Sequence, residues 1–446
     1  MSGPSTTERY SPEHLADLSE TLSDLRQEAY QTESDFHAQL VAVAPSCRDS
    51  AGNLLHYMAV RKHDLRALQY DLHRLGLSSL GRMEAYVLAT IDAVLEVIHH
   101  LGGPAPDHSR PADVDFDHGR LLLGEHAADL FGPPATDRDV QIMVTMPTQA
   151  ADEPAFVENL LRAGMNVMRI NCSKDDHATW ARMIENLQRG VEATASPCRI
   201  HMDLAGPNPR TAGVQKNFRL IVGDTLEVYA DSLPARPPRR NSEDDIVDPA
   251  RVSCTLPQVI RDVQVGDRLY YDDGGLTGRV IKTASDHFTV EIEQACKGSV
   301  KIRNDKGLNL PDTRLHLPSL TPKDLADLDF IVEYADMVGL SFVRTTADVE
   351  QLLDELDRRG GAALGKVLKI ETRQAFDELP NLLLTAMRRP PVGVMVARGD
   401  MGVEFGFDRM AEVQEEILWL CEAAHVPVIW ATQVLESLNK EGLPSR

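Results

Sequence analysis

Charged and polar residues interrupt several short apolar segments in the second half of the chain. They alternate with apolar residues in three places: Arg169, Asn171 and Ser173 in R-I-N-C-S, Lys369 and Glu371 in K-I-E, and Arg398 and Asp400 in A-R-G-D. Because alternate residues of a β-strand point to the same side, each group can converge on one site. A charge inside an apolar strand is unfavourable unless it is paired, so the recurrence favours a functional site over unrelated ion pairs.

The residue types indicate which chemistry such a site would perform. Glu371 and Asp400 carry the hard oxygen ligands that Mg²⁺ or Mn²⁺ takes together with substrate oxygens and water. Lys369 and Arg169 are cations suited to a phosphoryl group in transfer. Gly399 allows backbone N–H groups to approach an anion such as a carboxylate. Together they predict metal-assisted phosphoryl or enolate chemistry on a small anionic substrate.

Short apolar segments of β character begin after residue 139 and alternate with amphipathic helices. They are 140–146, 166–172, 198–205, 337–343, 366–371, 392–400 and 426–433. Such alternation is typical of a parallel α/β sheet, and the number of units is close to that of a β/α barrel. Barrels of this kind build their active sites at the carboxyl ends of the strands, where the polar residues lie and where Asp203 ends another strand. The β-rich, polar stretch from Ala205 to about Pro318 predicts a small domain inserted after the third strand.

The first hundred residues are predicted to form helices. Ser11-Pro12-Glu13 supplies an N-cap and a proline in the first turn, and leucines follow at helical spacing on one face. Further helices are expected from about Asn53 to Leu75 and from about Ser79 to Gly102. The stretch from Gly102 to Asp117 has the Pro and Gly content of a linker. We interpret the helical unit as a docking or oligomerisation module.

The composition is that of a globular protein without extended basic segments. Of 446 residues, 43% are hydrophobic and 26% charged, which suffices for a sizeable core. A formal charge of −22 argues against broad binding of nucleic acid or anionic membranes. The 6 cysteines include no C-x-x-C pair, so neither a disulfide framework nor a zinc site is indicated. No apolar run reaches the ~18 residues of a membrane span and the N-terminus lacks a signal-peptide core, so we expect a cytoplasmic protein.

From Asp139 to Arg446 the chain resembles the pyruvate kinase family. The motifs that carry the resemblance are AGMNVMRINCS, MDLAGPNPRT, YYDDGGL, KGLNLPDTRLHLPSLTPKDLADLDF, ADMVGLSFVR, KIE, VMVARGDMGVE and PVIWATQVLES. The resemblance implies an α/β fold, a TIM-type β/α barrel with an inserted β-rich lid domain, preceded by helices like those of a longer bacterial branch. The predicted domains are 1–103 (N-terminal helices), 104–138 (linker), 139–206 (barrel, first part), 207–309 (lid) and 310–446 (barrel, second part).

The resemblance implies transfer of a phosphoryl group from phosphoenolpyruvate to ADP, giving ATP and an enolate that is protonated to pyruvate. By motif, Arg169 would bind the substrate phosphate, Lys369 would stabilise the transferring group, and Glu371 and Asp400 would hold Mg²⁺ or Mn²⁺. The substrate carboxylate would be bound by Gly399, the Asp400 amide and Thr432. The positions matching a monovalent-cation site are Asn171, Ser173, Asp203 and the carbonyl of Leu204, and those matching nucleotide contacts are Asn171, Arg210 and Lys306.

Two departures from the family pattern bear on these roles. Where the family has T-K-G-P-E at the turn into the lid, this chain has Leu204-Ala205-Gly206-Pro207-Asn208. A lysine is lost and the acidic position associated with potassium dependence is an amide, which weakens the expectation that K⁺ is used. After Ser173 the family commonly has His-Gly, whereas this chain has Lys174-Asp175, a change at the nucleotide contacts.

The sequence ends where the family continues into an eighth strand, further helices and a C-terminal domain. We count seven barrel strands and expect the sequence to be a fragment of a longer, homo-oligomeric protein whose ligands are phosphoenolpyruvate and ADP or ATP. Two alternatives remain open. The same scaffold would act on another phosphorylated or enolate substrate, or the protein would be a non-catalytic regulatory one.

Overall fold

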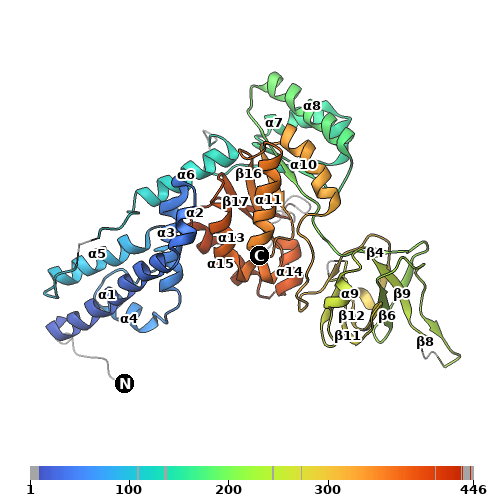
Figure 1. The fold of residues 1–446 in the computed structure, drawn as a ribbon, viewed down its shortest axis with the longest axis horizontal. Helices are drawn as coiled ribbons and strands as arrows, with labels where there is room; N and C mark the ends of the chain where they lie inside the picture. The colour runs from blue at the N-terminus through green and yellow to red at the C-terminus, as the bar shows by residue number, and fades with distance from the viewer. Residues whose placement is uncertain are drawn as a thin grey trace.

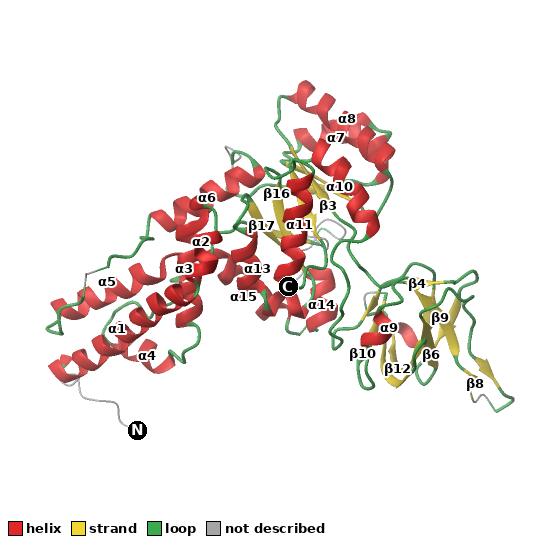
Figure 2. Cartoon of the chain, viewed as in Figure 1, coloured by secondary structure: helices red, strands yellow, loops and turns green. Residues whose placement is uncertain are grey.

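The computed structural model describes residues 10–107, 110–134, 138–243, 246–272, 274–406, 408–432, 434 and 442. Three parts follow one another in space: the N-terminal helices, a central sheet covered by helices, and a β-rich part attached at the far side (Figures 1 and 2). The expectation of a missing eighth strand concerns the end of the sequence, most of which lies outside the described residues. None of the helices described is long and apolar enough to cross a membrane.

Within the described residues the central sheet has seven strands, and all neighbouring strands are parallel. Their order is β1 (Met143–Thr145), β2 (Val167–Asn171), β3 (Arg199–Asp203), β15 (Met337–Leu340), β16 (Gly365–Ile370), β17 (Val392–Ala397) and β18 (Val428–Ala431). Every residue of β15, β16 and β17 is buried, because helices cover one face of the sheet and side chains fill the other. The sheet curls into part of a barrel, which confirms the predicted fold class.

Helices cover the outer face of this sheet. They are α7 (Pro154–Arg162), α8 (His177–Thr194), α10 (Pro322–Tyr334), α11 (Thr346–Arg358), α12 (Arg373–Asp377), α13 (Leu379–Ala386), α14 (Arg398–Phe405) and α15 (Met410–Ala423). Capping boxes begin two of them: Thr321 pairs with Asp324 at α10, and Thr345 pairs with Asp348 at α11. These side chains satisfy the free N–H groups of the first turn.

The β-rich part interrupts the barrel between β3 and β15, as predicted. Its strands are β4 (Thr211–Ala212), β5 (Phe218–Leu220), β6 (Thr225–Tyr229), β7 (Arg239–Arg240), β8 (Ile246–Asp248), β9 (Ala250–Cys254), β10 (Arg268–Tyr271), β11 (Leu276–Thr283), β12 (His287–Ala295), β13 (Val300–Ile302) and β14 (Leu308–Asn309), with a short helix α9 (Val259–Asp262). It has its own hydrophobic core. Asp324 anchors the entry, because its Oδ1 accepts the N–H groups of Ala205 and Gly206 at 2.9 and 3.2 Å. Arg344 anchors the return by donating to the carbonyl of Leu317 at 2.6 Å.

The N-terminal helices are α1 (Pro12–Asp35), α2 (His37–Ala42), α3 (Arg48–Val60), α4 (Arg66–Arg74) and α5 (Val87–His100). The start of α1 is as predicted, since the Ser11 side chain accepts the His14 N–H at 3.2 Å. The single helix expected from Asn53 to Leu75 is wrong: α3 ends at Val60, and Asp64 accepts the N–H of Arg66 to begin α4. The next helix begins at Val87 rather than near Ser79, because Leu80 and Arg82 have left-handed backbone conformations, with φ of 57° and 60°.

Buried hydrogen bonds attach these helices to the barrel. The Ala44 N–H donates to the Met387 carbonyl at 3.0 Å, and Asn53 Nδ2 donates to the Ala423 carbonyl at 2.9 Å. His425, after α15, lies 2.8 Å from the Ala85 carbonyl through Nε2 and 2.9 Å from Ser50 Oγ through Nδ1. Burial lowers the pKa of His425 to about 4, so the neutral imidazole donates at Nε2 and accepts at Nδ1.

The segment 104–138, predicted as a linker, contains the helix α6 (His118–Phe131), which closes the base of the barrel. Leu130 of α6 is 1% exposed and packs with Val167 and Met337 at the amino ends of the strands. A Cβ atom at Gly365 or Gly393 would lie 2.4 or 2.5 Å from the Leu130 methyl groups, so these two glycines provide the space for the leucine. The helix escaped prediction because the adjacent Pro- and Gly-rich residues dominate the local composition.

We expect Leu130→Ala to lower the free energy of unfolding by about 2–5 kcal/mol, because it empties a packed site beneath the sheet. Guanidinium denaturation measures the change. Leu121→Ala on the same helix is the matched control, since Leu121 is 61% exposed and its truncation leaves stability nearly unchanged. Equal effects of the two substitutions would contradict a role of α6 in closing the barrel.

Candidate active site

Four of the predicted residues form one connected cluster at the carboxyl ends of β2, β3 and β16. Arg169 Nε donates to Asp203 Oδ2 at 2.7 Å. Lys369 Nζ lies 3.6 Å from the same oxygen and 2.9 Å from Glu371 Oε1. Strand β15 separates β3 from β16, so Asp203 and Lys369 meet across it. Gly339 on β15 leaves room for this contact, because a Cβ there would lie 2.0 Å from Asp203 Oδ1.

Electrostatics keep the buried cluster ionised. Burial would raise the pKa of Asp203, but the charges of Lys369, His201 and Arg169 hold it well below its usual range. Burial would lower the pKa of Lys369, yet Asp203 and Glu371 raise it above its usual value. The site therefore presents paired cations and carboxylates in fixed positions, an arrangement suited to stabilising charge that moves during a reaction.

Ser341 belongs to the cluster although the sequence pattern gave it no role. Its Oγ accepts a hydrogen bond from Lys369 Nζ at 2.8 Å and donates to the Leu204 carbonyl at 2.7 Å. Ser341 thus holds the lysine in position and joins the end of β3 to the end of β15. Its place directly after an apolar strand was the available signal.

His201 and Thr145 also complete the cluster. His201 is fully buried, and its Nε2 lies 2.6 Å from Asp203 Oδ1. Arg169 donates to Thr145 Oγ1 at 2.7 Å, so Asp203 and Thr145 fix its guanidinium from two sides. The signal for His201 was its alternation with Asp203 in H-M-D, the same period of two that identified the other groups.

Glu371 and Asp400 are the carboxylates that the sequence predicts to hold a divalent cation. Both Glu371 oxygens also contact donors of the chain, Oε1 that of Lys369 and Oε2 that of Phe342. Glu371 is 2% exposed, and its Oε2 accepts the Phe342 N–H at 2.6 Å. Asp400 lies in the first turn of α14, which begins where the neighbouring strand β17 ends. Among the described residues no group of three or more His, Cys, Asp or Glu could hold a metal. Two carboxylates completed by substrate oxygens and water are the usual protein ligation of Mg²⁺.

Gly399 and Thr432 face each other across the ends of β17 and β18. A Cβ at Gly399 would lie 3.8 Å from Thr432 Oγ1. Arg398 donates to the carbonyls of Ala431, at 3.0 Å, and Thr432, and Thr432 has a left-handed φ of 65°. Arg398 therefore orients the segment that carries Thr432, so the hydroxyl and the start of α14 can act on one ligand.

Three of the residues that match a monovalent-cation site, Asn171, Asp203 and Leu204, have oxygen atoms that already accept hydrogen bonds from the chain, which weakens their fit to a potassium ion. Both carboxylate oxygens of Asp203 contact donors, and the Leu204 carbonyl accepts from Ser341. Asn171 Oδ1 accepts the Ser173 N–H at 3.0 Å. A further cation would also meet the positive charges of Lys369 and Arg169.

Arg210 and Lys306, predicted to contact the nucleotide, lie on adjacent segments at the base of the inserted domain. Arg210 pairs with Gly307 in an antiparallel bridge and donates to the Asp305 carbonyl at 3.1 Å. Lys306 Nζ lies 2.8 Å from Asp272 Oδ1. The structure thus brings these two residues together, in a part of the chain that is separate from the Lys369 cluster.

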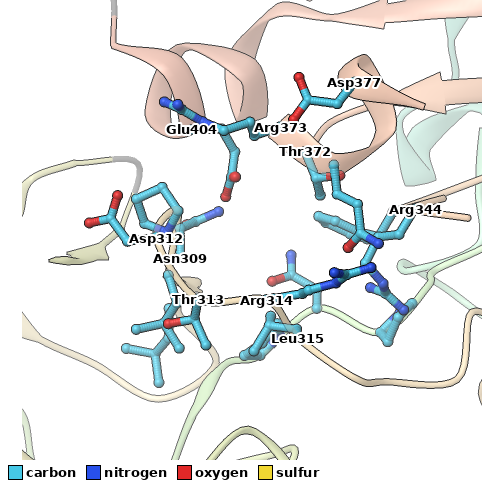
Figure 3. A pocket seen from close by; sticks show the side chains of 18 of the residues that line it. Asn309, Asp312, Thr313, Arg314, Leu315, Arg344, Thr372, Arg373, Asp377 and Glu404 are labelled. Atoms are coloured by element: carbon cyan, nitrogen blue, oxygen red, sulfur yellow. The ribbon is translucent and has the colours of Figure 1, made fainter. Parts of the chain in front are cut away.

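A pocket of 330 Å³ lies next to the Lys369 cluster, between the loop that follows β14 and the helices α12 and α14 (Figure 3). Arg314, Arg344 and Arg373 line it, with Asp312 and Glu404. Burial and the nearby Asp400 charge raise the pKa of Glu404 to about 7. The pocket borders both crossings into the inserted domain and contains none of the cluster residues, so it is a separate pocket beside the site.

Comparisons with known proteins agree with this architecture. Residues 137–446 match the family model of the pyruvate kinase barrel domain. The chain is 30% identical over 311 residues to a pyruvate kinase of Geobacillus stearothermophilus, covering 69% of this chain and 50% of that one. It is 31% identical over 346 residues to pyruvate kinase PKLR of Homo sapiens, covering 75% and 56%. A solved pyruvate kinase structure from Cryptosporidium parvum matches with a TM-score of 0.60 and 27% identity, over 72% of this chain and 63% of that one.

The chain spans about half the length of the curated relatives that it matches. The family model nevertheless extends over the parallel sheet and its inserted β-rich domain, which together make up well over half of the residues. The chain belongs to the pyruvate kinase family.

Proposed function

We propose that this protein transfers the phosphoryl group of phosphoenolpyruvate to ADP, giving ATP and pyruvate. The observation that supports this most is the buried cluster of Arg169, Asp203, Lys369 and Glu371 at the carboxyl ends of the barrel strands. Its paired charges suit a reaction in which negative charge moves from one oxygen to another and little covalent chemistry is required of the protein.

In this proposal the two cations act on the phosphoryl group. Arg169, fixed by Asp203 and Thr145, binds the phosphate of the substrate through its remaining N–H groups. Lys369, held by Ser341 and Glu371, places its ammonium where charge develops on the transferring oxygens. Both groups are positioned before substrate binds, so little reorganisation is needed in the transition state.

The remaining residues orient the substrate and the metal. Glu371 and Asp400 would hold a divalent cation, which when bound neutralises charge on the substrate oxygens. The backbone N–H groups at the start of α14, by Gly399, bind the substrate carboxylate, since a helix N-terminus favours an anion. Thr432 Oγ1 completes that contact. Arg210, Lys306 and Asn171 contact the nucleotide, which brings the inserted domain over the barrel.

A coupled assay of pyruvate formation from phosphoenolpyruvate, ADP and Mg²⁺ tests the proposal. We expect turnover that requires all three components. Turnover with a different phosphoryl acceptor in place of ADP would favour the alternative that the scaffold serves another substrate. Folded protein without any turnover would favour the non-catalytic alternative.

Potassium provides a separate prediction. Because the oxygens of Asn171, Asp203 and Leu204 already accept hydrogen bonds, we expect K⁺ to change the rate by less than about twofold at constant ionic strength. Tetramethylammonium chloride is the control salt. A rate increase of tenfold or more, on the order of the effect of one well-placed charge, would contradict this reading of the site.

Metal binding can be measured without turnover. We expect Glu371→Gln to weaken Mn²⁺ binding at least about 100-fold. The substitution removes one of the two carboxylates and keeps the shape of the side chain. Electron paramagnetic resonance of free Mn²⁺ gives the dissociation constant. Glu378→Gln is the control, since Glu378 lies beyond α12 and hydrogen-bonds only Asn381 through its side chain among the described residues. Unchanged Mn²⁺ binding in the first variant would remove Glu371 from the metal site.

A further inference from the structure

A thiol and an imidazole meet far from the active site, where the N-terminal helices rest on the barrel. Cys47 ends the turn Pro45–Cys47 and is 4% exposed. Its Sγ lies 4.0 Å from Nε2 of His126 on α6. The two residues line a cavity of 180 Å³ together with Asp129 and the barrel residues Met387 and Pro390.

The position of His126 is fixed by hydrogen bonds. Its Nδ1 lies 2.7 Å from the carbonyl of His425, and because a carbonyl only accepts, Nδ1 carries a proton. Nε2 lies 4.0 Å from the thiol sulfur and 3.4 Å from the Ser46 carbonyl, so it also carries a proton, and the ring that faces the sulfur is an imidazolium. Burial would lower the pKa of His126, but the hydrogen bonds to Cys47 and His425 outweigh burial and raise the pKa to about 9. An imidazolium at this place stabilises a thiolate.

The backbone favours a thiolate at the same place. Cys47 is the N-cap residue of α3, a helix of 13 residues that has no side-chain hydrogen bond at this cap. The free N–H groups of a helix N-terminus carry partial positive charge, which stabilises an anionic sulfur. The Cys47 side chain makes no hydrogen bond to the first turn, which also carries the acidic Asp49, so the imidazole is the group that directly faces the sulfur.

The other cysteines lack this combination. Burial raises the pKa of Cys172, Cys254 and Cys421, and it raises that of Cys198 to about 12. Cys296 is exposed in the inserted domain, in a turn of three residues and without a hydrogen bond or ion pair to an imidazole among the described residues. It is therefore an internal reference for an ordinary accessible thiol.

We propose that Cys47 is a site of oxidation by small hydroperoxides, activated by His126 and by the N-terminus of α3. The thiolate sulfur attacks one oxygen of the peroxide, the O–O bond breaks and an S–O bond forms. Sulfur is oxidised by two electrons to a sulfenic acid and the peroxide is reduced. The leaving hydroxide or alkoxide takes the proton from His126 Nε2, which leaves neutral imidazole and water or alcohol.

The cavity selects the oxidant by size and charge. A space of 180 Å³ admits hydrogen peroxide but not a tripeptide disulfide such as oxidised glutathione. The Asp129 carboxylate at the cavity also disfavours anionic oxidants. The oxygen that is added lies between the N-terminal helices and the barrel, three residues after the Ala44–Met387 hydrogen bond that joins them.

Oxidation rates of individual thiols test the proposal on the full chain. Aliquots treated with hydrogen peroxide are quenched in denaturant with iodoacetamide, and peptide mass spectrometry gives the unreacted fraction of Cys47 and Cys296 in one sample. We expect Cys47 to react at least about ten times faster than Cys296, because only the Cys47 sulfur faces an imidazolium. Oxidised glutathione should form no mixed disulfide with Cys47.

Two variants separate activation from structure. His126→Asn retains a donor in the place of Nδ1 and removes Nε2, whereas His126→Gln retains a hydrogen-bonding group in the place of Nε2 without its basicity. We expect both variants to reduce the rate of Cys47 oxidation to that of Cys296. The unfolding midpoint of each variant shows that it is folded. A wild-type Cys47 rate equal to that of Cys296, an unchanged rate in a folded variant, or a glutathione adduct on Cys47 would overturn the proposal.

Discussion

We expect replacement of Lys369 by methionine to lower kcat for the proposed formation of pyruvate by about 10³-fold, the largest of the predicted effects. The substitution keeps an unbranched side chain of nearly the same length but removes the ammonium that faces Asp203, Glu371 and Ser341. Loss of one preorganised charge from a buried site raises the barrier by about 4 kcal/mol. The coupled assay at saturating phosphoenolpyruvate, ADP and Mg²⁺ measures kcat.

Lys366→Met is the matched control for that experiment. Lys366 lies on the same strand, is fully buried and has a pKa lowered by burial to about 8. Its Nζ contacts only the carbonyls of Ala362 and Pro390 among the described residues, at 3.0 and 3.3 Å. We expect this variant to retain kcat within about threefold, because its charge is remote from the cluster. Equal losses in the two variants would attribute the effect to the strand and not to the Lys369 ammonium.

Asp203→Asn is expected to reduce both stability and activity. The carboxylate compensates Lys369 and Arg169 in a fully buried position, so its removal lowers the free energy of unfolding by about 3 kcal/mol. Arg169 loses the partner that orients it, which we expect to lower kcat about 100-fold. Urea denaturation and the coupled assay measure the two effects.

The difference in free energy of unfolding between the wild type and Asp203→Asn depends on pH with a definite sign. The pKa of Asp203 is held well below its usual range in the folded protein, so the stabilisation is fully present above the pKa of an unfolded aspartate, about 3.9. It is lost as pH falls through the folded pKa. The difference between the wild type and Asp203→Asn should therefore be constant from about pH 5 upward and shrink in acid. A difference that grows in acid would contradict the charged state of Asp203.

Asp336→Asn serves as the control for these measurements. Asp336 lies at the amino end of β15, where it pairs with Arg199 at 3.0 Å and accepts the Ile200 N–H at 2.7 Å. It belongs to the same sheet but to the end opposite the cluster. We expect a loss of stability of about 1 kcal/mol and an unchanged kcat.

Much of the site was predictable because its signals are local. Arg169, Lys369, Glu371 and Asp400 stand out as charges within or directly after apolar strands, and strand polarity places them at one end of the sheet. The same rule applied to H-M-D would have identified His201. Ser341 gave no comparable signal, since a serine after a strand is common in loops.

The helices show where local signals fail. The N-cap at Ser11 was read correctly because it depends on neighbouring residues only. The break between α3 and α4 depends on Asp64 accepting a backbone N–H, which competes with a helical pattern that continues in the sequence. Helix α6 was hidden because its stability comes from Leu130 packing beneath strands far along the chain, and not from its own composition.

The sequence by itself determined the order of the barrel strands, the insertion after the third strand and the types of residue that end each strand, because each depends on the pattern within one segment. Only the tertiary structure decided which of those residues touch. Asp203 reaches Lys369 across β15 because Gly339 has no side chain there, and Leu130 closes the barrel because Gly365 and Gly393 make room for it. Such contacts depend on the register and curl of strands that are distant in sequence, which no local pattern specifies.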